Sequence, residues 1–408
     1  MGITQEKLNQ PTAAAAQAIN SLGVELLTLA TTPGENALLS PYSIQSVLAM
    51  VYAGAGGETW AEMQKVLHYP EDGGELHDSF ESLRIDLELM TVEVQGNEHL
   101  NSSRKGEKAP FVLSMANRLY GQKGFEFRQP FLSLLSRKYG TTLEALDYVS
   151  DPALAAKVIN GWVEEQTAGR IRDVISPEAM DQDTRLVLVN AIYLKARWEN
   201  QFGKSETHDA PFYVRGQIPE EVPTMEQLAS LGYRKEDGFC VVAMPYVGRE
   251  VQFLILLPDG RDGLAEMERR ITQEMLAVCQ SLPVQEVRLF LPKFELATPT
   301  YDLSEVMKDF GIKQAFDEPK GSANFEGIAP RRGDDYLALS KLLHQAYLKV
   351  DEEGTEAAAV SIQNVIMGGI DLEPPKPIEV RVDRPFLFAI QHKASGACLF
   401  MGRVVDPR

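Results

Sequence analysis

The chain has 408 residues, of which 44% are hydrophobic and 24% are charged, as in an ordinary globular protein that can bury a large core. Its 40 basic and 58 acidic residues give a net charge of −18, which argues against nucleic acids, anionic membranes and polyanions as partners. The three cysteines, Cys240, Cys279 and Cys398, are far apart and form no CxxC pair. They predict small core side chains rather than a disulfide framework or a zinc site.

No stretch approaches the ~20 apolar residues of a membrane helix. Residues 1–23 have neither a basic n-region nor an apolar h-region, so the sequence predicts no signal peptide. We therefore expect a cytoplasmic protein, or a secreted one if a signal had been removed. Asn101-Ser102-Ser103 is a glycosylation sequon within the polar stretch 95–110, which we expect to be an unmodified surface loop.

The first half of the chain favours helices. Apolar residues at helical spacing predict a helix over Ala13–Ala30, and Ser40 followed by Pro41 predicts the capped start of another. Two more helices follow, in TWAEMQKVLHY and ELHDSFESLRIDLELM. From Phe111 the pattern predicts a strand, two helices that each end at a glycine, and an apolar strand, in the segments FVLSMANRLYG, RQPFLSLLSRKYG, LAAKVINGWVEEQTAGRI and TRLVLVNAIYLKARW.

The second half favours strands. They are predicted in FCVVAMPYV, VQFLILLPDG, EVRLFLPKFEL, HQAYLKVDEEG, IEVRVDRPFLFAIQH and CLFMGRVV. Helices are predicted over Leu264–Gln280 and Leu303–Phe310. Without a repeat or an obvious linker, the chain reads as one α+β domain over residues 1–408.

Motifs for catalysis or cofactor binding are absent from the sequence. There is no GxSxG, HExxH, Walker loop or calcium loop, and the six histidines are scattered without metal-ligand spacing. The segment GAGG at Gly54–Gly57 lacks the spacing of a dinucleotide-binding loop. We therefore expect no enzyme activity, no metal and no cofactor, with a hydrolase built from distant residues as the weaker reading.

One segment near the C-terminus is unusual. From Ala357 to Ile370 the chain carries no charge and no proline, and it is built of small, β-branched and amide side chains. Such a segment in solvent is an unpaired strand that can add to a sheet.

Eight stretches, in this order, resemble the serpin family. They are NALLSPYSIQSVLAM, MANRLYGQKGFEF, INGWVEEQTAGRIRDVI, TRLVLVNAIYLKARWENQF, VRLFLPKFEL, YDLSEVMKDFGI, VDEEGTEAAAVSI and RPFLFAIQHKASGACLFMGRVVDP. The resemblance implies an α+β fold of three β-sheets and about nine helices with an exposed reactive loop, here about residues 352–377. It implies a suicide-substrate inhibitor of serine proteases, whose cleaved loop inserts into the main sheet. The alternative is a non-inhibitory serpin that acts as a binding or chaperone protein.

The alternation of side chains around the loop hinge supports insertion. Before the loop, Ala346, Leu348 and Val350 share one face with Glu352. Beyond Gly354 the inward set would be Thr355, Ala357, Ala359, Ser361, Gln363 and Val365, so its first members are small. The change of parity at Glu353-Gly354 predicts a hairpin reversal, so the inserted strand would run antiparallel to the strand it leaves. The hinge comprises Glu352, Glu353, Gly354, Thr355, Glu356, Ala357, Ala358 and Ala359.

The resemblance also assigns two supporting groups. It sets Glu352 beside Lys293 and near Trp198, as a latch at the entrance of the sheet. It sets a polar cluster beneath the centre of the sheet, formed by Ser40, Ser43, Asn190 and His344. Asn117 and Thr207 also fit family positions, but we expect no role for them beyond packing and turns.

The attacked bond is ambiguous from the sequence. The family's count from the hinge glutamate reaches Gly368, which gives Gly368–Gly369, whereas Met367–Gly368 and Ile366–Met367 offer apolar side chains. No Arg or Lys lies between Glu356 and Pro375, so elastase-, chymotrypsin- or subtilisin-like targets are favoured over trypsin-like ones. The expected partner is a serine protease in a covalent acyl-enzyme complex with a monomeric inhibitor. The acidic stretch Glu81–Glu88 argues against activation by heparin.

Overall fold

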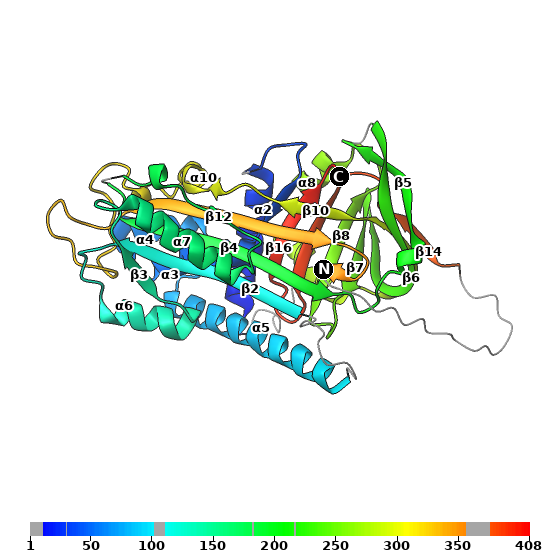
Figure 1. Ribbon diagram of the computed structural model, residues 1–408, viewed down its shortest axis with the longest axis horizontal. Helices are drawn as coiled ribbons and strands as arrows, with labels where there is room; N and C mark the ends of the chain where they lie inside the picture. Colours follow the sequence, from blue (N-terminus) through cyan, green and yellow to red (C-terminus); the bar gives the residue numbers. More distant parts are fainter. Residues whose placement is uncertain (1–10, 30, 102–110, 182, 216–217, 356–375) are drawn as a thin grey trace.

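The computed structural model describes residues 11–29, 31–101, 111–181, 183–215, 218–355 and 376–408 (Figure 1). Nine α-helices lie within these residues, which agrees with the expected α+β class. They are α2 (Ala13–Leu29), α3 (Pro41–Tyr52), α4 (Gly57–Val66), α5 (Gly73–Asn101), α6 (Gln129–Leu134), α7 (Pro152–Gln166), α8 (Leu264–Arg270), α9 (Gln273–Val278) and α10 (Ser304–Phe310). A π-helical turn, η1 (Leu135–Tyr139), continues α6.

A central sheet carries the features that matter for function. Its strands, in spatial order, are β10 (Phe294–Ala297), β12 (Leu339–Val350), β13 (Gly354–Thr355), β4 (Leu186–Arg197), β2 (Phe111–Gln122) and β3 (Leu143–Leu146), with β11 (Tyr301–Asp302) paired to β12. The strands β12, β4 and β2 run side by side through the left and central part of the view, and α7 lies over β2 (Figure 1).

A second network of strands lies at the end of this sheet where β4 and β12 finish, on the right in Figure 1. In spatial order it contains β1 (Ala37–Leu39), β16 (Cys398–Val404), β15 (Phe386–His392), β8 (Val251–Pro258), β7 (Phe239–Pro245), β6 (Ile218–Glu236), β9 (Val284–Pro292) and β14 (Ile378–Arg381), and β5 (Thr207–Val214) pairs with β6. The first part of β6 pairs with β5, and its last part pairs with β7. The long strand β6 therefore joins the two smaller sheets of the expected three-sheet fold into one hydrogen-bonded network.

The helix α3 forms the floor of the central sheet. Ser40 is its N-cap and accepts a hydrogen bond from the Ser43 N–H, and Pro41 occupies the first turn, as the sequence predicts. All twelve residues of α3 are buried, because the helix is enclosed by β2, β4 and β16. A helix that is covered on every side can carry few charged residues, which explains its apolar and small polar composition.

Several predicted boundaries are wrong. The stretch 95–110 is not a loop at its start, because α5 continues through Asn101 although Gly96, Asn97 and Asn101 have low helix propensity. The helix expected over Leu264–Gln280 is divided, because the Thr272 side chain caps a new helix, α9, by accepting from the Met275 N–H. The strand expected across VRLFLPKFEL breaks at Lys293 into β9 and β10, which belong to different sheets.

The cysteine prediction is confirmed, since Cys240, Cys279 and Cys398 are all free and buried. In the described residues, no helix is both long and apolar enough to cross a membrane.

Candidate functional site

The candidate site is the seam between β4 and β12 in the central sheet. These strands pair directly and in parallel from Leu186 with Leu339 to Tyr193 with Tyr347. Beyond this stretch, at their C-terminal ends, the two strands are separated by β13. Thr355 of β13 pairs with Val350 on one side and with Ala196 on the other. As the change of parity predicts, β13 runs antiparallel to both neighbours. The hinge therefore lies at the C-terminal end of the seam, and over the rest of the seam β4 and β12 are bonded directly to each other.

The reversal into β13 depends on Gly354. Its φ of 154° lies in a region that side chains disfavour, and a Cβ atom there would lie 2.0 Å from the Ala196 carbonyl oxygen. The turn is closed by the Asp351 N–H, which donates to the Gly354 carbonyl at 2.9 Å. Only glycine lets the chain turn this close to β4.

The residues predicted for a latch at the sheet entrance, Glu352 and Lys293, are in direct contact. Lys293 Nζ donates to both carboxylate oxygens of Glu352, at 2.9 and 2.8 Å, and Glu352 is 7% exposed. The Thr207 hydroxyl donates to Glu352 Oε1 at 2.9 Å, a contact that the sequence analysis did not anticipate. Burial raises the pKa of Glu352, but the hydrogen bonds from Lys293, from a backbone N–H and from Thr207, together with the charge of Lys293, outweigh burial and hold the pKa below its ordinary value.

Trp198 positions the hinge through its backbone and its ring. Its indole Nε1 donates to the Asp351 carbonyl at 2.9 Å, and its backbone N–H donates to the Glu353 carbonyl at 3.0 Å. The ring stacks on Tyr246 at a centroid distance of 4.6 Å. The Tyr246 hydroxyl in turn bonds the Thr355 hydroxyl at 2.8 Å. Thr355 is thereby held in a site where it is fully buried.

The polar cluster lies under the closed part of the seam and links three elements. The Ser40 N–H donates to His344 Nε2 at 3.2 Å, so Nδ1 of the neutral ring carries the proton and donates to Asn190 Oδ1 at 2.5 Å. Asn190 Nδ2 donates to Ser43 Oγ at 2.5 Å and to Asn117 Oδ1 at 2.7 Å. Side-chain hydrogen bonds thus join β12, β4 and α3, and the backbone N–H of Ser40, the N-cap of α3, adds a further bond to β12.

Burial controls the charge of this cluster. It lowers the pKa of the His344 imidazole to about 3, so the ring is neutral at physiological pH. Buried polar groups are stable only while they stay paired, because an unsatisfied donor or acceptor costs about 1–3 kcal/mol. Separating β4 from β12 would break the bond between Asn190 and His344, so the cluster opposes opening of the seam.

The structure thus brings together the residues predicted for the latch and for the polar cluster. The sequence analysis gave Asn117 and Thr207 no role beyond packing and turns and did not name Tyr246, because the partners of these residues are far away in the chain and leave no local signal. The reactive-bond candidates Met367, Gly368 and Gly369, and the hinge residues Glu356 to Ala359, lie outside the described residues. Within the described parts of the chain, His, Cys, Asp and Glu side chains nowhere gather in threes that could hold a metal ion.

Glu352→Gln tests the latch. We expect the free energy of unfolding to fall by about 1–3 kcal/mol at neutral pH, because the charge-assisted bond from Lys293 is lost. Since the pKa of Glu352 is lowered by folding, this stabilisation is present above the unfolded pKa of about 4.3 and disappears as the pH falls through the folded value. Thermal unfolding at neutral and acidic pH measures it.

The matched control for the latch is Glu226→Gln, which breaks a pair with Arg288 on β9 at 2.6 Å. This pair is partly exposed, so its loss should cost no more than about 1 kcal/mol. A Glu352→Gln effect that equals the control, or that persists unchanged at acidic pH, would contradict the latch.

Asn190→Leu tests the polar cluster. We expect the free energy of unfolding to fall by about 2–4 kcal/mol, because His344 and Asn117 each lose a buried partner. Hydrogen exchange of the β4 and β12 amides should also accelerate, since the seam opens more easily. The control Asn160→Leu removes two hydrogen bonds between α7 and Ile175, away from the seam. Equal exchange of β4 and β12 in the two variants would contradict the assignment.

Comparisons with known proteins identify the family. The family model described as Serpin (serine protease inhibitor) matches residues 17–407. The chain is 37% identical over 384 residues to a leukocyte elastase inhibitor of Bos taurus, covering 92% of this chain and 94% of that protein. It is 35% identical over 402 residues to a serpin B6 of Pongo abelii, covering 96% and 99%.

A crystal structure of Serpin48, described as a highly specific serpin in the insect Tenebrio molitor, is similar over the full length of both chains. The TM-score is 0.75 at 29% identity, and 100% of each chain is covered. The family model, the relatives and the solved structure all match nearly the whole sequence, and all of them indicate the same family. The chain belongs to the serpin family.

Proposed function

We propose that this protein is a suicide-substrate inhibitor of serine proteases, with residues 352–377 as its reactive loop. The observation that carries the proposal is the position of β13. Gly354 and Thr355 already pair between β4 and β12, antiparallel to both, at the end of the seam where insertion would begin. The inserted strand would continue from Thr355 along the seam as β4 and β12 separate.

The mechanism follows from this geometry. The target's serine attacks the carbonyl of the bait residue, the peptide bond breaks, and the released amine leaves on the C-terminal fragment while the inhibitor stays bound as an ester. The freed segment then inserts between β4 and β12 and carries the protease along the molecule. Deformation of the target's oxyanion hole stops hydrolysis of the ester. The catalytic residues belong to the protease, and this chain supplies none.

The energy for this step comes from the strand that remains outside the sheet until cleavage. About 14 residues at ~3.3 Å each would give an inserted strand of roughly 45 Å. Its hydrogen bonds and buried area become available only after the loop is cut, so the intact protein is kinetically trapped. The latch and the polar cluster supply the barrier.

The targets we propose are elastase-, chymotrypsin- or subtilisin-like proteases. The loop carries no Arg or Lys between Glu356 and Pro375, and a relative named leukocyte elastase inhibitor is 37% identical. Met367–Gly368, Ile366–Met367 and Gly368–Gly369 are the candidate bonds, of which the first offers a flexible apolar side chain to an apolar pocket.

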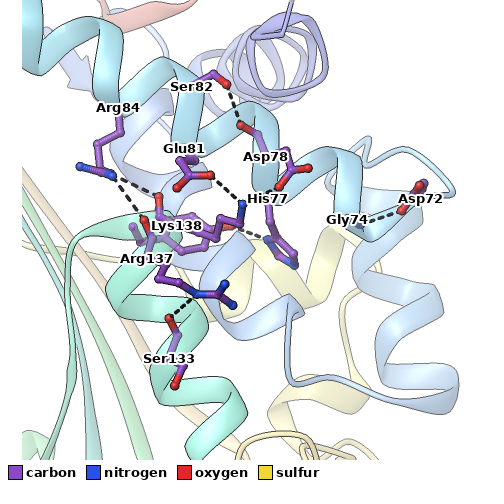
Figure 2. A network of polar contacts seen from close by, with 11 residues as sticks. Asp72, Gly74, His77, Asp78, Glu81, Ser82, Arg84, Ser133, Arg137 and Lys138 are labelled. Carbon is purple, nitrogen blue, oxygen red and sulfur yellow. Dashed lines mark hydrogen bonds and ion pairs between the residues drawn. The ribbon is translucent and has the colours of Figure 1, made fainter.

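We further propose that the protein acts as a monomer and without heparin. On α5, Arg84 is paired with Glu88. Lys138 of η1 is paired with Asp78 and Glu81 (Figure 2). These cations are therefore already neutralised on the surface where α5 meets η1, which disfavours a polyanion there. The alternative, a non-inhibitory binding protein, would be cleaved without trapping the protease.

Thr355→Arg tests the anchored end of the loop, from which the proposed insertion would begin. Thr355 is fully buried beside Tyr246, and a guanidinium at this site would have no partner for its charge. We expect the variant to be cleaved as a substrate, with at least ~10-fold less SDS-stable complex with pancreatic elastase. The control Ser205→Arg puts the same charge on an exposed residue beside Lys204 and should inhibit normally. Equal complex formation by both variants would exclude insertion past Thr355.

Oxidation tests the bait residue. If Met367 is attacked, its conversion to the polar sulfoxide should lower the rate of elastase inhibition by roughly tenfold. The chain has 13 methionines, so Met367→Leu serves as the control that peroxide cannot affect at this position. If oxidation lowers inhibition in both the parent and Met367→Leu, or in neither, Met367 is not the attacked residue, and Ile366 or Gly368 takes its place as the candidate.

A further inference from the structure

The helix α5 carries a row of apolar side chains on its solvent side. Ile85, Leu89 and Val92 follow each other at spacings of four and three residues, which places them in one row along the helix. Their exposed fractions are 39%, 62% and 67%. Leu83 and Leu87 of the same helix are buried and pack on the core. The exposed row, called the α5 row below, is therefore a second apolar face of this helix.

Folding does not account for the α5 row. A surface helix needs one apolar stripe to pack on the core, and its opposite side is ordinarily polar or charged. Single exposed apolar residues are common on proteins, but several at helical spacing are typical of a surface that binds another helix. In Figure 1, α5 lies along the lower edge of the molecule, and no other labelled element lies below it. A partner can therefore approach the helix from that side.

Acidic side chains border the α5 row. Asp86 and Glu93 lie seven residues apart, directly after the first and last members of the row, so both are on the same side of it. Both are exposed, and neither forms an ion pair within the described residues. On the other side of the row, Glu88 is paired with Arg84 at 2.7 Å. The Asp86 and Glu93 carboxylates are therefore available to the cations of a partner.

A groove of about 480 Å³ adjoins this acidic side. It is lined by Pro11, Thr12, Ser82, Ile85, Asp86 and Ala394. Asp86 is the one charged residue among them, and the walls are mainly apolar. A lysine or arginine side chain fits such a groove, because its methylene stem packs on apolar walls while its charge meets the carboxylate. The groove therefore favours a basic side chain beside the α5 row.

Charge decides among the possible occupants of this surface. The net charge of −18 attracts a cationic partner and repels anionic ones, an anionic membrane included. A second copy of this chain is disfavoured, because it would bring Asp86 and Glu93 of both copies to one interface. The occupant that matches both the apolar row and the acids beside it is a basic amphipathic helix.

We propose that the α5 row and its groove dock a basic amphipathic helix of a partner protein. Apolar residues of the partner pack on the row, and its lysines or arginines pair with Asp86 and Glu93. The surface is built from α5, the start of α2 and the turn between β15 and β16. The proposal therefore stands independently of loop insertion and of the proposed function.

Fluorescence anisotropy with a labelled synthetic peptide tests the docking. The probe is an amidated peptide of about 15 leucines and lysines, arranged so that the leucines share one face of a helix. We expect saturable binding, and at least ~10-fold weaker binding of a peptide with the same residues in scrambled order, because its leucines no longer share a face. Absence of saturable binding would overturn the proposal. Equal binding of the two peptides would also overturn it, since only general attraction to an acidic protein would remain.

Two variants with matched controls locate the site. Leu89→Gln keeps a good helix former but removes apolar contact, and it should weaken binding of the probe at least ~5-fold. Its control, Leu154→Gln, changes a leucine of α7 that is 55% exposed and should bind as the parent does. Asp86→Asn should weaken binding about 2–5-fold at low salt, whereas Glu165→Gln on α7 should not. Equal effects of a variant and its control would overturn the site.

Sedimentation of the protein alone, over a range of concentrations, tests the second copy as occupant. We expect the same sedimentation for the parent and for Leu89→Gln, because the acids beside the row oppose self-association. Self-association that Leu89→Gln abolishes would assign the α5 row to a second copy and overturn the basic partner.

Discussion

The direct pairing of β4 with β12 is the constraint on which the rest of the structure depends. From Leu186 to Tyr193 the two strands are hydrogen-bonded to each other in parallel, and a new strand could only enter by replacing those bonds. Above Tyr193 the strands already admit β13 between them. The seam therefore has two arrangements in one molecule. The strands are paired directly over most of its length, and they are separated by β13 only at their C-terminal ends.

Three kinds of interaction keep the boundary between these states in place. Gly354 turns the chain where a side chain would clash with Ala196, and Thr355 is held by Tyr246. Glu352 and Lys293 secure the strand before the turn. Beneath the closed part, His344 and Asn190 bond across the seam itself. Under the proposed mechanism each of these contacts would change as the strands separate, so a few buried polar bonds would set a kinetic barrier that weak surface pairs could not.

The sequence predicts the parts of this site that depend on local pattern. The helix start at Ser40-Pro41, the apolar strand β4 and the change of parity at Glu353-Gly354 are each visible within a few residues, because capping and alternation are local effects. The latch and the polar cluster needed the family resemblance, because no local pattern joins Glu352 to Lys293. Asn117 and Thr207 fit that resemblance but were given no role, since their hydrogen bonds depend on partners that the fold brings together.

The strands β5 and β6 were missed for a related reason. They contain Pro211, Pro219, Pro223 and Gly232, which normally argue against a strand. The fold overrides this preference, because β6 pairs with three other strands along its length. The break at Lys293 is likewise invisible in an apolar run, since it reflects which sheet each half joins. Tertiary pairing, and not local propensity, decides these elements.

The central claim is that the loop becomes a strand of the central sheet once it is cut. Thermal unfolding of the intact and the thermolysin-cleaved protein, under the same buffer conditions, tests it most directly. The account predicts that the cleaved form melts higher by roughly 10–25 °C, because a full strand of new hydrogen bonds at ~1 kcal/mol each has been added. Identical melting of the two forms, with the loop shown to be cut by mass measurement of the released C-terminal peptide, would contradict it.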